Sequence, residues 1–148
     1  MPGNGRDRVQ CIEWLFWQMG GLGPMAGQNH HFGQYAPEKL PYAIDRYVRE
    51  TARLYAVLNQ RLSTRPWIAG DAYSIADMAC YPWIVPHARQ QQDLNDFPHL
   101  QAWFERIRAR PATLRAYARG TAINVTPSVS DDKSRALLFG QSAKTITP

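Results

Sequence analysis

Tyr73-Ser74-Ile75-Ala76-Asp77-Met78 has the residues of a helix start and stands directly ahead of a strongly apolar segment. If Ser74 is the N-cap, its hydroxyl can accept a hydrogen bond from the backbone N–H of Asp77, and the Asp77 carboxylate can accept one from the N–H of Ser74. This pairing is a capping box with Asp in the usual place of Glu or Gln. Tyr73 and Met78 then occupy the two positions of a hydrophobic staple. Because the residues that follow carry no charge, the sequence predicts a helix that is buried on most sides.

Apolar residues recur at helical spacing in several other stretches, and no stretch alternates with period two for long enough to indicate a sheet. Further helices are expected over 9–19, 44–62, 100–107 and 112–118, with a short one around 136–139. The glycines and proline of 20–24 are expected to release the chain from helical geometry or kink it. Pro82 and Pro86 are expected to bend the capped helix from within, and Gly120 to close the helix over 112–118. The sequence therefore predicts an all-α fold with about five principal helices.

Length, apolar content and cysteine use restrict the class of protein. A chain of 148 residues with 45% hydrophobic content is long enough for one domain with a real core. No apolar run approaches the ~18 residues of a membrane span, and the N-terminus lacks the order of a secretory signal. Cys11 and Cys80 each lie in an apolar run and are expected to be buried thiols. We expect a cytoplasmic protein without a membrane partner.

The excess of basic residues could indicate a polyanionic partner, but the distribution of the charges does not favour one. Lys and Arg outnumber Asp and Glu by 17 to 12, which leaves a basic nucleic-acid binder as one alternative. However, Asp45 with Arg49 and Arg46 with Glu50 stand at i,i+4, the pattern of a solvated helix face. Because acids interleave the bases in this way, no nucleic-acid partner is expected.

A metal site is also not expected. His30 and His31 are adjacent, and His87 lies further along the chain. Adjacent histidines rarely share one ion, and no carboxylate or thiol stands at ligand spacing from them. The histidines are therefore better candidates for hydrogen bonding than for metal coordination.

The chain resembles the glutathione transferases. The run Trp67-Ile68-Ala69-Gly70-Asp71, followed by Ser74-Ile75-Ala76-Asp77, resembles the segment that begins the central helix of their C-terminal domain. Residues 14–32, WLFWQMGGLGPMAGQNHHF, are similar to the corresponding stretch of one bacterial and fungal branch, which includes the nu class and the yeast prion-forming relative. The implied fold is an orthogonal helical bundle, the C-terminal domain of a glutathione transferase.

The resemblance divides the chain into parts. It implies a remnant or linker over 1–7, the transferase-like helical domain over 8–120, and a C-terminal extension with one short helix over 121–148. Within the extension, 137–141 and 142–145 resemble the tail of longer family members. Seven residues ahead of position 8 are too few for a βαβ pattern, so the family's thioredoxin-like N-terminal domain is expected to be absent.

The resemblance also implies glutathione as substrate or cosubstrate. A helix followed by a glycine-opened turn with Gln, Asn and His presents hydrogen-bonding groups that can hold a polar ligand. In this branch the C-terminal domain reaches the charged ends of the tripeptide, a role carried here to Asn29 and Arg46, with Gln28 and His31 as weaker candidates. Arg46 suits a carboxylate because its guanidinium donates two parallel hydrogen bonds. The structural alternative is that Arg46 only pairs with Glu50 and that Asn29 only caps a helix or turn.

Four aromatic residues are candidates for an apolar pocket that takes the second substrate, a small electrophile or a disulfide. They are Trp14, Phe32, Tyr81 and Trp83. An aromatic residue on a helix is more often part of the core, so each has a structural alternative.

The implied activity is glutathione conjugation, or glutathione-dependent reduction of disulfides or peroxides, by a full-length homodimer. In this family the groups that lower the thiol pKa of glutathione belong to the thioredoxin-like domain. Neither cysteine of this chain sits in an evidently electropositive, exposed setting, so no catalytic residue is predicted and the chain alone is expected to be inactive. The alternative from another class is a non-catalytic interaction module derived from a glutathione transferase.

Overall fold

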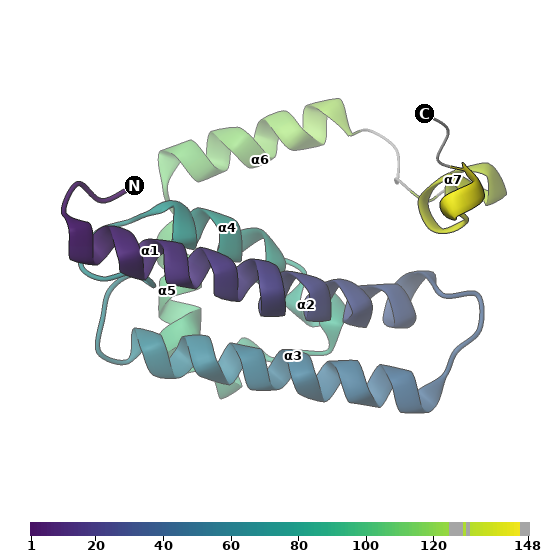
Figure 1. The fold of residues 1–148 in the computed structure, drawn as a ribbon, viewed down its shortest axis with the longest axis horizontal. Coiled ribbons are helices and arrows are strands. Elements are labelled where there is room, and N and C mark those ends of the chain that lie inside the picture. Colours follow the sequence, from purple (N-terminus) through teal and green to yellow (C-terminus); the bar gives the residue numbers. More distant parts are fainter. Residues whose placement is uncertain (125–128, 130, 146–148) are drawn as a thin grey trace. The chain divides into compact units, whose positions relative to one another are not determined.

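The computed structural model describes residues 1–124, 129 and 131–145, and every regular element among them is helical. The α-helices are α1 (Gly5–Trp17), α2 (Gly23–His30), α3 (Pro41–Leu62), α4 (Ile75–Ile84), α5 (Pro98–Arg108), α6 (Pro111–Ile123) and α7 (Asp132–Phe139) (Figure 1). The only extended pairing within this part of the chain is an isolated bridge between Trp67 and Gly70. The all-α prediction is confirmed. The chain forms two compact units, residues 1–108 and 109–148.

In the first unit, α1 and α2 follow one another without leaving helical geometry. A π-helical turn, Gln18–Leu22, joins them, and the N–H of Gly23 bonds to the carbonyl of Gln18 five residues back. Pro24 falls in the first turn of α2, where a missing N–H is tolerated. The expected release from helical geometry at 20–24 is therefore wrong. The chain stays helical because the glycines, which have no side chains to crowd the backbone, allow the turn to widen.

α3 runs back alongside α1 and α2 in the view of Figure 1. Its buried residues are Thr51, Leu54, Tyr55, Leu58 and Leu62, and their helical spacing agrees with the apolar pattern that predicts a helix over 44–62. In α5, where a helix with recurring apolar residues is expected over 100–107, the buried residues are Leu100, Trp103, Phe104 and Ile107. Asn59 on α3 accepts hydrogen bonds from the N–H of His99 at 2.8 Å and of Leu100 at 3.1 Å, so the side chain of one helix holds the start of the other.

The start of α4 has the predicted capping box. Asp77 accepts a hydrogen bond of 2.8 Å from the N–H of Ser74, and the Ser74 hydroxyl accepts one of 3.2 Å from the N–H of Ala76. The Asp77 side chain is fully buried and also accepts from the N–H of Ile68 at 3.0 Å and from the indole N–H of Trp103 at 2.9 Å. One carboxylate thus joins the preceding loop, α4 and α5.

Two finer expectations for this helix differ from the structure. Met78 is 51% exposed and the ring of Tyr73 packs edge-on against Trp67 with centroids 5.1 Å apart, so the staple gains no support. α4 ends at Ile84, so Pro86 lies beyond it rather than within it. A proline lacks the N–H that a further helical turn requires, and the chain continues as a 3₁₀ turn, His87–Gln90.

The second unit contains α6 and α7. α6 runs through Gly120 to Ile123, so the expected helix end at that glycine is wrong. α7 is a short helix over Asp132–Phe139 and begins with its own capping box, formed by Asp131 and Ser134. The polar run Thr126-Pro127-Ser128 lies outside the described residues.

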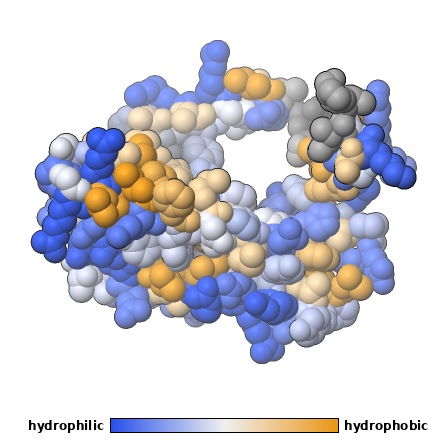
Figure 2. All heavy atoms as spheres, in the orientation of Figure 1, coloured by the Kyte–Doolittle hydropathy of each residue, from blue (hydrophilic) through white to orange (hydrophobic). Residues whose placement is uncertain are grey.

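The core of the first unit is built from α1, α3, α4 and α5, with buried Cys11, Leu58, Cys80 and Trp103 among its members. Figure 2 shows hydrophobic side chains gathered over α1 on the face in view. Val9 and Phe16 on α1 are 55% and 73% exposed, so large apolar side chains of this helix are uncovered in this chain. Within the described part of the chain, no helix is both long and apolar enough to cross a membrane.

Candidate functional site

Asn29 belongs to the core in this structure. Its side chain is 2% exposed, and its amide nitrogen donates to Oγ1 of Thr51 at 3.0 Å and to the carbonyl of Gln90 at 3.1 Å. The carbonyl of Tyr47 lies 3.4 Å from the same nitrogen. Since an amide nitrogen has two hydrogens, both are used inside the protein. The arrangement supports the structural alternative, in which Asn29 ties α2 to α3 and to the turn after α4.

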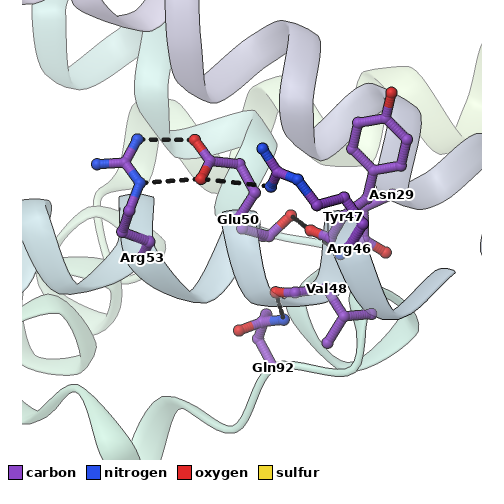
Figure 3. Close-up of polar contacts among 8 residues, drawn as sticks. Asn29, Arg46, Tyr47, Val48, Glu50, Arg53 and Gln92 are labelled. Carbon is purple, nitrogen blue, oxygen red and sulfur yellow. Dashed lines mark hydrogen bonds and ion pairs between the residues drawn. The ribbon is translucent and has the colours of Figure 1, made fainter. Parts of the chain in front are cut away.

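Arg46 lies on the surface of α3, with its side chain 57% exposed (Figure 3). Its guanidinium is 3.7 Å from Oε2 of Glu50. Glu50 is held more closely by Arg53, which donates to both carboxylate oxygens at 2.9 and 2.7 Å. The hydrogen bond from Arg53, with the charges of Arg53 and Arg46, holds the pKa of Glu50 below its usual value. Arg46 is thus the loosely held member of the cluster and can turn to another carboxylate.

A groove of about 380 Å³ lies where the π-helical turn meets α2 and α4. Its lining residues are Gln18, Met19, Gly23, Pro24, Gly27, Gln28 and Trp83. Two predicted residues, Gln28 and Trp83, therefore meet at one surface although they come from different helices. A hydrogen bond fixes the backbone at Trp83, because its carbonyl accepts from the hydroxyl of Tyr55 at 3.2 Å.

Gln18 is the residue of this groove that the sequence reading missed. Its side chain is 4% exposed, yet it lines the groove. The sequence held one signal, because Gln18 is one of three polar residues in the otherwise apolar run 9–19, with Gln10 and Glu13. Glu13 is exposed, whereas Gln18 turns inward at the π-helical turn.

His31 and Phe32 belong to a second π-helical turn, His31–Tyr35, which follows α2. The two rings meet edge-on with centroids 5.2 Å apart, and Phe32 stacks on Tyr47 of α3 at 5.5 Å and 9°. Both residues are half-buried. Phe32 therefore packs against Tyr47 of α3 and is not among the groove residues.

Trp14 and Tyr81 pack into or against the core. Tyr81 is 6% exposed and stacks on Phe104 with ring centroids 5.2 Å apart. Trp14 meets Trp17 edge-on at 5.1 Å and lies under the guanidinium of Arg61 at 5.3 Å. Of the four aromatic candidates, the structure assigns Trp83 alone to the groove. The other three pack against aromatic or cationic neighbours elsewhere.

The cysteines do not form a reactive site. Cys11 and Cys80 are both buried and unpaired, as expected. Burial, and next the negative charge of Asp77, raise the pKa of the Cys80 thiol above its usual value, which disfavours the nucleophilic thiolate. Among the described residues, no three His, Cys, Asp or Glu side chains are grouped to hold a metal ion.

Curated relatives of known name match most of this chain. The disulfide-bond oxidoreductase YfcG of Escherichia coli K12 is 58% identical over 111 residues, which cover 75% of this chain and 52% of the relative. The disulfide-bond oxidoreductase YghU of the same organism is 36% identical over 133 residues, covering 85% and 45%. The chain thus spans about half the length of the curated relatives it matches.

Solved structures of glutathione transferases are also similar to this chain. A glutathione transferase of Burkholderia graminis, with two glutathione molecules bound per subunit, superposes with a TM-score of 0.71 at 40% identity and covers 78% of this chain and 51% of that chain. A glutathione transferase of Phanerochaete chrysosporium, in complex with oxidised glutathione, has a TM-score of 0.76 at 29% identity, with 82% and 57% covered. The model of the C-terminal domain of glutathione S-transferases matches residues 25–111. The chain therefore belongs to the glutathione S-transferase family and carries its C-terminal helical domain.

Proposed function

We propose that this chain is the helical part of a glutathione-dependent enzyme, and that Arg46 binds a carboxylate of glutathione. The observation that carries the proposal is that Glu50 pairs closely with Arg53 and only loosely with Arg46. Arg53 donates to both of its oxygens, while Arg46 is 3.7 Å away with a side chain 57% exposed. A guanidinium in this state can form a two-pronged hydrogen bond with an incoming carboxylate. The names of the relatives and the glutathione in the neighbouring structures support this ligand.

The proposed reaction is reduction of a disulfide or peroxide by glutathione, or conjugation of glutathione to an electrophile. Gln28 and Trp83 line one groove, which supports placing the second substrate there. His31 and Phe32 are proposed as secondary contacts of the tripeptide, because Phe32 stacks on Tyr47, the residue that follows Arg46 in the sequence, and on its other side meets His31. Asn29 is left out of the proposed site because its amide hydrogens are used inside the core.

The reacting thiol in this proposal is that of glutathione, not one of the protein. Cys80 is buried with a raised pKa, and Cys11 is buried in the same core. The group that stabilises the glutathione thiolate is proposed to belong to a thioredoxin-like domain outside this sequence. The chain by itself is then expected to bind glutathione without turning it over.

The working form is proposed to be a homodimer in the cytoplasm. The exposed apolar side chains of Val9 and Phe16 on α1 support coverage of this helix by other protein, because exposed apolar surface often marks an interface. The two unpaired cysteines are consistent with a reducing compartment. Size-exclusion chromatography with light scattering tests the dimer.

Titration of reduced glutathione into this chain, followed by calorimetry or NMR, tests the carboxylate contact. Arg46→Ala is expected to weaken binding by about 1 to 3 kcal/mol, roughly 5- to 150-fold, the scale for a hydrogen bond to a charged group. Arg53→Ala is expected to weaken it by a few-fold, because Glu50 then pairs closely with Arg46. Arg49→Ala is the matched control, since Arg49 is exposed on the same helix and pairs with Asp45 at 2.9 Å. Equal affinity in the parent and Arg46→Ala would remove Arg46 from the site, and absence of binding would favour a non-catalytic interaction module.

A further inference from the structure

We propose that three side chains between α1 and the end of α3 bind a phosphate group, at a site separate from the one proposed for glutathione. They are Gln10 on α1, Arg61 in the last turn of α3, and Arg65 in the loop that follows, and together they are called the Gln10 site. The start of α1 and the end of α3 lie at the same end of the first unit (Figure 1). Arg46 precedes Arg61 on α3 by four helical turns, about 22 Å along the helix axis.

Two guanidinium groups converge on one neutral oxygen in the Gln10 site. Oε1 of Gln10 accepts a hydrogen bond of 3.2 Å from Arg61 and one of 3.3 Å from Arg65. Neither arginine forms an ion pair with a carboxylate among the described residues. The C-terminal end of a helix attracts cations, which accounts for one guanidinium near the end of α3. An uncharged oxygen does not balance the charge of two, so the site lacks a counter-charge.

The pKa of Arg61 indicates that the site is positive. Burial, and next the positive charge of Arg65, lower the pKa of Arg61 below its usual value, and the opposing effect of Glu13 is smaller. Glu13 is exposed and lies one turn beyond Gln10 on α1. Since the like charge outweighs the opposite charge at Arg61, an anion bound here would relieve repulsion in addition to accepting hydrogen bonds.

The Gln10 site has more hydrogen-bond donors than acceptors. All three residues are half-buried. A guanidinium carries five N–H groups. Arg61 uses one for the carbonyl of Ile68 and one for Gln10, while Arg65 uses one for Gln10. The side-chain nitrogen of Gln10 donates to no residue in the described part of the chain. An oxyanion would supply the acceptors that these donors lack.

The arrangement of the donors favours phosphate over carboxylate. A carboxylate pairs best with two parallel N–H groups of one guanidinium. In Arg61, Nε donates to Ile68 at 2.8 Å and Nη2 donates to Gln10, so this pair of nitrogens is already engaged. Phosphate has three acceptor oxygens and can take single hydrogen bonds from separate side chains. The guanidinium of Arg61 also lies over the ring of Trp14, 5.3 Å from its centroid, which holds it in place for a ligand.

The test titrates inorganic phosphate into the full chain at constant ionic strength, with acetate as the carboxylate probe. The indole N–H signal of Trp14 in NMR spectra reports on the site because its ring lies under Arg61, and the indole signal of Trp83 is the remote reference. Phosphate is expected to shift the Trp14 signal saturably and to bind about fivefold more tightly than acetate, since it carries more charge and more acceptors. Methyl phosphate distinguishes the two sources of this group: binding at least as tight as that of inorganic phosphate supports a phosphorylated ligand, and weaker binding supports the free ion.

Three variants define the site. Gln10→Glu places a carboxylate where the guanidinium groups converge and is expected to weaken phosphate binding by about tenfold or more, because it supplies the missing charge and repels the ligand. Arg65→Gln removes one guanidinium and is expected to weaken binding by about fivefold or more. Arg49→Gln is the matched control, since it removes the same charge from an exposed position of α3, and its phosphate affinity is expected to equal that of the parent. Arg61 is kept because it also holds the carbonyl of Ile68.

Several results would overturn the assignment. They are equal phosphate affinity in the parent and Gln10→Glu, no loss in Arg65→Gln, equal responses to phosphate and acetate, or a loss in Arg49→Gln as large as that in Arg65→Gln, which would reflect net charge alone. The proposed function is tested separately. Arg46→Ala is expected to leave phosphate binding unchanged, and Gln10→Glu is expected to leave glutathione binding unchanged, so either site can fail while the other stands.

Discussion

The indole N–H of Trp103 donates to Oδ1 of Asp77 at 2.9 Å, and this bond joins α5 to the first turn of α4. The same oxygen accepts from the backbone N–H of Ile68 at 3.0 Å, while Oδ2 accepts from Ser74. The Asp77 side chain is fully buried. A residue that begins one helix is thus also the hydrogen-bond acceptor for a loop and a second helix.

Asp77→Ala is expected to destabilise the fold by about 3 to 5 kcal/mol. The substitution leaves buried donors of Ile68, Ser74 and Trp103 without an acceptor, and each unpaired donor is unfavourable by about 1 to 3 kcal/mol, with less than full additivity. Urea unfolding followed by circular dichroism measures the change. Asp131→Ala is the matched control, since Asp131 forms the same capping device at α7 in an exposed setting. A loss no larger than about 1 kcal/mol, the value for an ordinary cap, in Asp77→Ala would contradict the junction role.

Asn29→Ala is expected to lower stability by about 2 kcal/mol and to leave the affinity for glutathione unchanged. The amide ties Thr51 on α3 to the carbonyl of Gln90, and both contacts are buried. Chemical denaturation and a glutathione titration on the same sample give the two readouts. Weakened glutathione binding in a variant that remains folded would instead return Asn29 to the ligand site.

Local signals explain what the sequence predicted well. The capping box at Ser74 and Asp77 depends on residues three apart, and the apolar stripes of α3 and α5 depend on helical periodicity. The contacts of Asn29 within the core could not be predicted from local sequence, because its partner Gln90 is 61 residues away. Only the folded chain brings such residues together, so an amide next to a glycine-opened turn looked like a ligand contact.

The π-helical turn shows a second limit of sequence reasoning. Gly20, Gly21 and Gly23 predict a break by their intrinsic preference, yet the segment is packed between α3 and α4, and a widened turn keeps the backbone hydrogen bonds. Gln18 turns inward at this wider turn. Hydrophobic periodicity does not encode such a backbone detail, so the groove could not be predicted from it. Gln28 and Trp83 were identified as separate candidates, but their meeting at one groove required the tertiary structure.

Gly23→Ala is expected to destabilise the fold by about 1 to 2 kcal/mol, the usual scale for overpacking. The new Cβ would lie 2.7 Å from Nε2 of Gln18 and 3.3 Å from its carbonyl oxygen, so the amide must move and the backbone has little room. Gly20→Ala, by contrast, meets nothing within 4 Å and is expected to be neutral or stabilising by up to about 1 kcal/mol through helix propensity. Thermal unfolding of the pair measures the difference. Equal stability of the two variants would show that the turn relaxes freely around Gly23.

His30 is expected to make stability fall as the solution becomes acidic. Burial, and next the positive charge of Arg89, lower the pKa of His30 below its ordinary value of 6.5, and its Nδ1 is buried without a hydrogen bond to any described residue. Below pH 6.5 the unfolded chain therefore binds a proton that the folded chain does not, so the free energy of unfolding rises with pH up to about 6.5 and then levels, with a slope of at most about 1.4 kcal/mol per pH unit. Urea unfolding of the parent and of His30→Gln between pH 5 and 8 measures this contribution, with His99→Gln on the exposed surface as the control. The slope is expected to flatten in His30→Gln alone; the same slope in all three proteins would assign the acid sensitivity to other groups.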